Sequence, residues 1–376
     1  MHAIAAHSYL QSFLINILLP RMLLEALFSV RTLVLLAVLA SAYLLRTKRR
    51  PLFPVLNTKD YVSNAATLIA SGLAQHQGPI TLPLPNAQKI ILPSSLTSWV
   101  KTNKNLDHRE LVRQDFYADY PGFEGLTAMH SVFMGDFILD VIRAKLGQND
   151  SIMPVLNASA KKAVQAHWGD SKEWHAIDWH NGTTSIIARV ASSVFVGPEK
   201  CDDEEWLALV QAYVGAYFSA VGELHAYPAW SRRIVQRFLP NAVACRKYVA
   251  EARVIMNGVV EKRRKDVTEA TLEGRTPPAF NDVIAWTEDA VSAARKPEAG
   301  DIQLSLAMAA FFTTSELFRQ VLIDVAMHPE IVAPLRDEAA QQLETHGISV
   351  AAIYNMVLMD SVLKESQRRS AAIGML

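Results

Sequence analysis

The feature of the sequence that most constrains the fold is the segment 301–327, which contains neither glycine nor proline and is apolar over most of its length. At a rise of 1.5 Å per residue, a helix over this segment is roughly 40 Å long. Apolar residues on most of its faces predict burial through the middle of a large domain. Asp301 is the predicted N-terminal cap, and His328 before Pro329 ends the helix, because the residue before a proline disfavours helical backbone angles.

Two threonines, Thr313 and Thr314, interrupt the apolar run near the centre of this helix. β-Branched hydroxyl residues are poor choices for a buried helix interior unless the hydroxyl has a polar partner. Two interpretations therefore stand side by side. Either the hydroxyls bond to carbonyl groups of the preceding turn, or they face something polar outside the helix.

Length and composition limit the class of protein. The chain has 376 residues, half of them hydrophobic, so it can bury a sizeable core as one large domain or two smaller ones. Its 37 basic residues balance its 37 acidic residues, which gives no indication of nucleic acid as a partner. The only cysteines are Cys201 and Cys245, which excludes a disulfide framework and a multi-cysteine metal site and fits a reducing compartment.

The N-terminus has the composition of a membrane anchor. Residues 1–45 are strongly apolar, and the best spanning segment is 22–45, although Glu25 and Arg31 weaken its first half. A basic cluster and a proline follow this segment: Arg46, Lys48, Arg49, Arg50 and Pro51. Basic residues on this side place the following domain in the cytoplasm. A signal peptide is the alternative, but its basic residues would precede the apolar run.

This pattern predicts a membrane anchor at residues 1–50, followed by a folded domain at residues 51–376. The expected location is the endoplasmic reticulum membrane, with a single span and a cytoplasmic domain. Three glycosylation sequons, at Asn149, Asn157 and Asn181, are then predicted to face the cytoplasm and remain unmodified.

The domain after the anchor is predicted to be mainly helical with a small β element near its start. Residues 80–82 and 89–92, separated by Pro85 and Asn86, predict a short hairpin. Residues 109–125 are interpreted as a loop. Further helices are predicted from apolar patterning and from Gly and Pro punctuation at 59–77, 93–100, 133–146, 152–167, 179–196, 204–221, 227–237, 241–264 and 281–294.

Two polar clusters could suggest metal binding, and both have simpler interpretations. His175 and His180 are five residues apart, a spacing that does not stack two ligands on one helix face. The acidic run 202–205 could suggest a magnesium site, but Ala285 and Asp289 stand where a companion motif needs Ser and Glu. Acidic residues are favoured at a helix start, which explains the run without a metal.

The C-terminal segment carries a more specific pattern. Glu365 and Arg368 are three residues apart on one helix face, where they can pair. Other segments precede this pair in chain order: the N-terminal anchor, Asp107-His108-Arg109, residues 194–197 followed by Cys201 and Trp206, the helix with Trp286, the long helix with Thr313-Thr314, His328-Pro329-Glu330 and Leu335-Arg336-Asp337-Glu338, with the pair itself in residues 364–368. In its order and spacing, this series resembles the haem-thiolate monooxygenases of the cytochrome P450 family, specifically the membrane-bound fungal branch of secondary metabolism.

The resemblance implies a cytochrome P450-like helical fold in which residues 301–327 cross the distal face of haem b. It implies that Thr313, with Thr314 beside it, assists proton delivery at the haem. Ala309 and Ala310 would keep the helix thin at that point. Phe312 stands where the family commonly has an acid.

The implied partners are NADPH-cytochrome P450 reductase, a membrane and a small apolar substrate. The predicted substrate pocket includes Ala309, Ala310, Phe311, Phe312 and Phe218. Its aromatic residues suggest a terpenoid or a prenylated alkaloid as the guest.

One departure from the family pattern concerns the haem ligand. The family's axial cysteine lies in a glycine-rich loop, and neither Cys201 nor Cys245 has that context, so the expected metal ligand is missing. The family also places an arginine of a later loop against the pair that Glu365 and Arg368 match, and in the family these residues fix the haem-side core. The resemblance therefore implies a structural role beside the haem for Glu365 and Arg368. Because the glycine-rich loop is missing, we expect the chain to be C-terminally truncated. Because thiolate ligation promotes O–O cleavage, we also expect it to be inactive in oxygen chemistry. The alternative is a non-catalytic, membrane-anchored helical protein, a degenerate paralogue.

Overall fold

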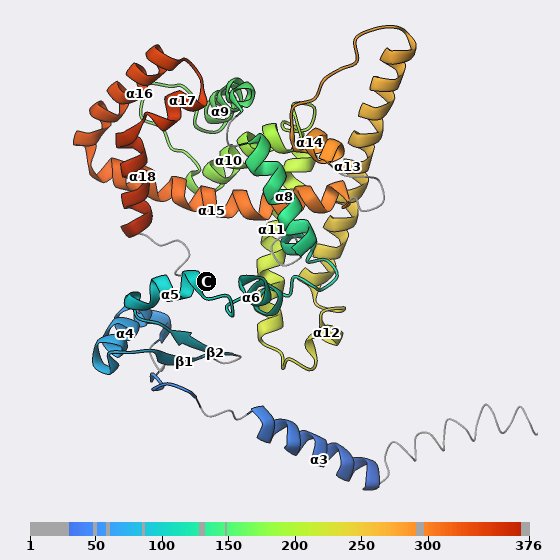
Figure 1. Ribbon diagram of the computed structural model, residues 1–376, viewed down its shortest axis with the longest axis vertical. Coiled ribbons are helices and arrows are strands. Elements are labelled where there is room, and N and C mark those ends of the chain that lie inside the picture. The colour runs from blue at the N-terminus through green and yellow to red at the C-terminus, as the bar shows by residue number, and fades with distance from the viewer. Residues whose placement is uncertain are drawn as a thin grey trace, which may run out of the picture. The chain divides into compact units, whose positions relative to one another are not determined.

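The computed structural model describes residues 30–47, 51–57, 61–84, 87–127, 132–146, 149–290 and 297–369 (Figure 1). The chain divides into two compact units, Met1–Asn103 and Lys104–Leu376. The boundary predicted at residue 50 stays a prediction.

The first unit contains the predicted hairpin. Strands β1 (Ile80–Leu84) and β2 (Ala87–Ile91) pair antiparallel, with Ile80 opposite Ile91 and Leu82 opposite Lys89. The described part of this unit also contains helices α3 (Val30–Thr47), α4 (Tyr61–His76) and α5 (Thr97–Thr102) and the 3₁₀ turn η2 (Ser94–Leu96). Ile80 and Leu82 are buried with Leu56, and α4 packs on this small core. The prediction of a small β element near the start of the domain is confirmed.

Helix α3 coincides with the second half of the predicted membrane span. The residues of α3 from Val34 to Leu39 are all exposed. This exposure is expected for an apolar helix that does not pack against other protein segments. The first part of the predicted span, residues 22–29, and the basic residues 48–50 lie outside the described residues. Transmembrane insertion of this helix therefore remains a prediction.

In the described residues of the second unit, every regular element is a helix. Its α-helices are α6 (His108–Asp115), α8 (Val132–Lys145), α9 (Met153–Trp168), α10 (Trp179–Phe195), α11 (Glu204–His225), α12 (Arg232–Val235), α13 (Pro240–Leu272), α14 (Val283–Ala290), α15 (Ala299–Met327), α16 (Val332–His346), α17 (Val350–Tyr354) and α18 (Val357–Arg369). Short 3₁₀ turns are η3 (Glu124–Leu126), η4 (Asp150–Ile152) and η6 (Pro329–Ile331). The prediction of a mainly helical fold is confirmed.

Two predicted segments differ from the structure. Residues 109–125 are not a loop throughout, because Asp107 caps α6 by accepting a hydrogen bond from the Arg109 amide at 2.8 Å. The helix predicted over 227–237 is reduced to the four residues of α12. The chain turns before α12, where the Ser231 hydroxyl donates to the Pro228 carbonyl.

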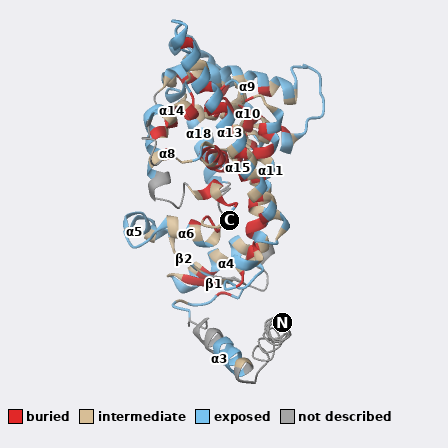
Figure 2. Cartoon of the chain, turned by 90° about the vertical axis from the view of Figure 1, so that its right-hand side faces the viewer, coloured by how far each residue is buried: buried red, intermediate tan, exposed pale blue. Residues whose placement is uncertain are grey.

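Helix α15 occupies the centre of the second unit and packs against α10, α13, α18 and η3 (Figures 1 and 2). Its first half is buried on nearly all faces, from Ile302 to Met308. Among the described residues, α11 and α15 are two helices long and apolar enough to cross a membrane. Both contribute buried residues to the same hydrophobic core, so we interpret them as core helices.

Asp301 does not cap α15 as predicted. The N-cap is Glu298, and Asp301 lies in the first turn, where its carboxylate accepts two hydrogen bonds from the Arg253 guanidinium at 2.8 and 2.9 Å. Gly300 makes this close approach possible, because a Cβ there would lie 2.6 Å from the backbone nitrogen of Arg253. The start of α15 is therefore fixed to the middle of α13.

A buried ion-pair network joins α13 to the segment before α14. The Arg263 guanidinium donates to both oxygens of Asp282 at 2.8 and 2.7 Å, and it also bonds to Glu199 and to the Val196 carbonyl. The Arg263 and Asp282 side chains are only 8% and 2% exposed. Gly197 lies against them with φ +81, and a Cβ there would be 2.3 Å from Asp282 Oδ2. Removal of either residue would leave the charge of the other buried without its ion-pair partner.

We expect Arg263→Ala to lower the free energy of unfolding by about 3–5 kcal/mol, because it leaves the buried Asp282 carboxylate without its guanidinium partner. Arg264→Ala is the matched control: Arg264 is 63% exposed and pairs with Glu288, so its loss should cost less than about 1 kcal/mol. Urea unfolding followed by circular dichroism measures both. Equal losses for the two variants would contradict the role assigned to the network.

Candidate functional site

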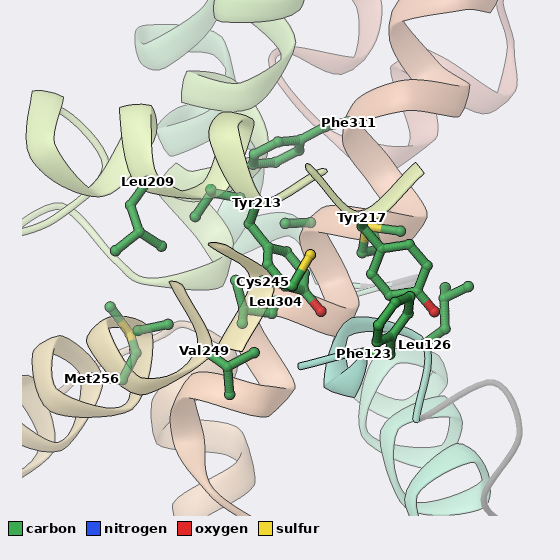
Figure 3. Close-up of a cluster of buried hydrophobic side chains, with 14 of the residues drawn as sticks. Phe123, Leu126, Leu209, Tyr213, Tyr217, Cys245, Val249, Met256, Leu304 and Phe311 are labelled. Atoms are coloured by element: carbon green, nitrogen blue, oxygen red, sulfur yellow. The ribbon is translucent and has the colours of Figure 1, made fainter. Parts of the chain in front are cut away.

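The centre of α15 has one open face. Ala309, Phe312 and Thr313 are exposed and lie on the same side of the helix, as their spacing of three and four residues requires. Thr314 is also exposed, at the edge of this face. Phe311 points the opposite way and is buried in the hydrophobic core with Tyr213 and Leu304 (Figure 3). Within one turn, the helix thus changes from burial on nearly all faces to exposure on one face.

Thr313 has a local hydrogen bond. Its hydroxyl donates to the Ala309 carbonyl at 2.6 Å, so the first of the two interpretations from the sequence is confirmed for this residue. Because a hydroxyl oxygen keeps two acceptor lone pairs while its proton is donated, Thr313 Oγ1 can still accept a hydrogen bond on the open face.

The predicted pocket residues are only partly brought together. Phe218 on α11 and Phe312 on α15 have ring centroids 5.6 Å apart and inclined at 43°. Ala309 lies on the same face, and Ala310 is half-buried against the hydrophobic core. Phe311 belongs to that core, so an apolar wall on this side would be built from Phe218 and Phe312 and not from Phe311.

Arg319 is a polar residue of this region that the sequence analysis did not identify. It is buried, with its side chain 8% exposed, and it bonds to Glu316 one turn earlier on α15. Its guanidinium also donates to the Thr183 hydroxyl at 2.9 Å and the Thr184 hydroxyl at 3.1 Å on α10. These bonds fix the rotation of α15 about its axis. An arginine within an apolar helix was the signal that could have identified it.

The predicted pair on α18 is formed. The Arg368 guanidinium donates to both oxygens of Glu365 at 2.7 and 2.6 Å. These hydrogen bonds lower the pKa of the Glu365 carboxyl. Both side chains are more than half exposed, and Glu365 also lines a groove of about 290 Å³ between α18 and the end of α15. A role of the pair beside a haem stays a prediction.

The two cysteines do not face the open side of α15. Cys245 is buried in the hydrophobic core, and burial raises the pKa of its thiol to about 12 (Figure 3). Burial also raises the pKa of Cys201, whose sulfur lies 3.7 Å from the Pro198 carbonyl oxygen. A metal requires a thiolate, and burial disfavours the thiolate at both positions. In the part of the chain that the structure describes, no group of three or more His, Cys, Asp or Glu side chains could hold a metal ion.

These residues fit one side of a haem. The open face presents Ala309 and Phe312 beside the Thr313 hydroxyl, and the small side chain of Ala309 leaves room for a flat, largely apolar group. The described residues that form it provide no iron ligand, because neither thiol is on this face. The described part of the chain thus fits the distal side of a haem, and the fit does not extend to an axial thiolate.

Comparisons with known proteins point to one family. Residues 130–376 match the family model described as Cytochrome P450. The chain is 35% identical to Cytochrome P450 monooxygenase 1 of Gibberella fujikuroi, over 74% of this chain and 63% of that protein. It is 31% identical to Cytochrome P450 monooxygenase eqxH of Fusarium heterosporum, over 86% of this chain and 64% of that protein.

The fold has a counterpart among solved structures. Retinoic acid-bound cyanobacterial CYP120A1 is similar with a TM-score of 0.53 and 13% sequence identity, over 85% of this chain and 69% of that chain. At this identity the likeness concerns the fold alone. The chain spans less than two thirds of the length of the two fungal relatives.

We expect both cysteines to be unreactive in the folded protein. With a pKa of about 12, Cys245 is almost entirely thiol below pH 9, and its reactive thiolate appears only as the pH approaches 12. Maleimide labelling at pH 7, read by mass spectrometry, should modify neither cysteine in buffer and both in urea. Rapid labelling of Cys245 in buffer would show that its surroundings are open to solvent.

Proposed function

Because the chain belongs to the cytochrome P450 family, we propose that it supplies the distal side of a haem monooxygenase that oxidises an apolar secondary metabolite. The observation that carries this proposal is the open face of α15, where Ala309, Phe312 and Thr313 are uncovered opposite Phe218. Haem, when bound, supplies the redox chemistry, and the protein supplies shape, orientation and proton handling.

Each residue of the open face has a distinct role in this proposal. Thr313 Oγ1 donates its proton to the Ala309 carbonyl and therefore presents lone pairs that can hold a water molecule or a proton donor. Phe312 offers no acid at the position where the family has one. Glu316, one turn further along the same face, is half-buried and held by Arg319. Proton transfer through Thr313 would then depend on Glu316 or on solvent.

The same geometry supports an apolar substrate. The rings of Phe218 and Phe312 form a wall that joins α11 to α15, and burial of apolar surface against aromatic rings is the main source of affinity for such a guest. A terpenoid or a prenylated alkaloid is the class we propose, with NADPH-cytochrome P450 reductase as the electron donor.

We propose that the protein is held at the endoplasmic reticulum membrane with its helical domain in the cytoplasm. The apolar helix α3 supports an anchor. In the second unit, Trp230, Ile234 and Phe238 are strongly exposed around α12, next to Arg232 and Arg233. Aromatic and aliphatic side chains beside arginines are typical of surfaces that contact a lipid headgroup region.

We also propose that neither Cys201 nor Cys245 is the thiolate ligand of such a haem, because both lie in the core with raised pKa values. A non-catalytic membrane-anchored protein is the competing proposal. The two differ in whether the open face of α15 takes haem at all.

Haem titration of the purified full chain tests the assignment of the face. We expect Thr313→Trp to weaken haem binding at least roughly tenfold, since an indole on the open face blocks a flat macrocycle. Ser219→Trp, on an exposed position of α11, is the matched control and should leave the affinity unchanged. Equal affinities for wild type and Thr313→Trp would favour the non-catalytic alternative.

The reduced carbon monoxide difference spectrum of the same haem-loaded chain tests the ligand. We expect no thiolate-type Soret shift. A thiolate-type shift that disappears in Cys201→Ser or Cys245→Ser would show that one of these sulfurs reaches the iron and would overturn the proposal that neither is the ligand.

Membrane orientation is tested by the three sequons at Asn149, Asn157 and Asn181. Expressed in a fungal host, the full chain should show no change in gel mobility after endoglycosidase treatment, because oligosaccharide transfer occurs on the luminal side. A sequon introduced near residue 5 should be modified, since the N-terminus is proposed to be luminal. Modification of the native sequons would reverse the proposed topology.

A further inference from the structure

A groove separate from the open face of α15 runs between α11 and α13. Its volume is about 570 Å³, within the range of small-molecule sites. The floor is apolar and includes Leu209, Ala212 and Ile255. None of its lining residues belongs to the open face. Phe218 lies nine residues beyond Leu209 on α11, roughly 14 Å along the helix axis.

The charged side chains described along this groove are negative. Among the described residues that line it, the charged ones are Glu205 and Glu251, one from each helix. Lys247 contacts Glu251 at 3.6 Å from a side chain that is 73% exposed, so this ion pair is weak. Among the residues described, the Glu205 carboxylate has no ion pair, and it is exposed at the rim. Two carboxylates on opposite sides of the groove repel an anion and attract a cation.

The groove also contains one aromatic ring, that of Tyr248, which is half-buried on α13. Carboxylates and an aromatic ring over an apolar floor are the groups that recognise alkylammonium ions, because the ring face attracts the cation while the floor contacts its carbon substituents. We propose that this groove binds a small apolar alkylammonium ion. This inference does not depend on the proposed haem chemistry.

Small side chains leave room for the guest. Ala208 and Ala212 are one turn apart on α11 and face the groove, and Ala250 faces it from α13. All three are exposed, so nothing in the described part of the chain covers them. A leucine at position 212 would fill the floor without entering the hydrophobic core, which makes Ala212→Leu a test of the space itself.

The experiment is calorimetric titration of the full chain, in a non-ionic detergent at pH 7, with benzyltrimethylammonium. We expect saturable binding at one site and none with benzenesulfonate, which has the same ring and the opposite charge. Glu205→Gln and Glu251→Gln should each weaken binding roughly three- to thirty-fold. Glu261→Gln, an exposed carboxylate of α13 outside the groove, is the matched control and should not change the affinity.

Ala212→Leu should reduce the affinity at least roughly tenfold while leaving the thermal unfolding midpoint unchanged. The proposal is overturned if benzenesulfonate binds as well as the cation, or if neither glutamine variant changes the affinity. It is also overturned if the chain forms a dimer that Ala212→Leu dissociates, because a second copy would then be the occupant of the groove.

Discussion

Attachment of α15 at two points is the constraint on which the rest of the second unit depends. Near its start, Asp301 accepts two hydrogen bonds from Arg253 of α13. Two thirds of the way along, the buried Arg319 bonds to Thr183 and Thr184 of α10. Guanidinium groups bond with a fixed fork geometry, so each contact restricts rotation as well as distance. Between these points the helix can turn only one face outward, and that face carries Thr313.

Aromatic residues of α11 connect the same core to the segment before α8. The Tyr213 hydroxyl donates to the Gly122 carbonyl at 3.2 Å and accepts from the Gly125 amide at 2.8 Å. The Tyr217 hydroxyl donates to the Phe116 carbonyl at 2.8 Å. Buried hydroxyls that lack partners are costly, so these bonds hold the irregular segment in one conformation. The core is therefore specified by a few satisfied polar groups as well as by apolar packing.

Family membership and geometry support the functional proposal in different ways. The family model covers residues 130–376 and sets the expectation of haem chemistry. The structure contributes the orientation of individual side chains: Phe312 outward beside Phe218, Phe311 inward, and both thiols in the interior. The groove with Glu205 and Glu251 lies outside that chemistry and follows from the shape of α11 and α13 alone.

The sequence alone determined the helical class, the hairpin, and most helix limits, because apolar periodicity and Gly or Pro punctuation act over a few residues. It also identified the pairing of Glu365 with Arg368, which are neighbours on one turn. Only the tertiary structure decided that Asp301 binds Arg253 instead of capping its helix, and that Phe311 and Phe312 face opposite environments. Those outcomes depend on which helix packs against which face. A contact between residues 48 positions apart produces no pattern in the nearby sequence from which it could be predicted.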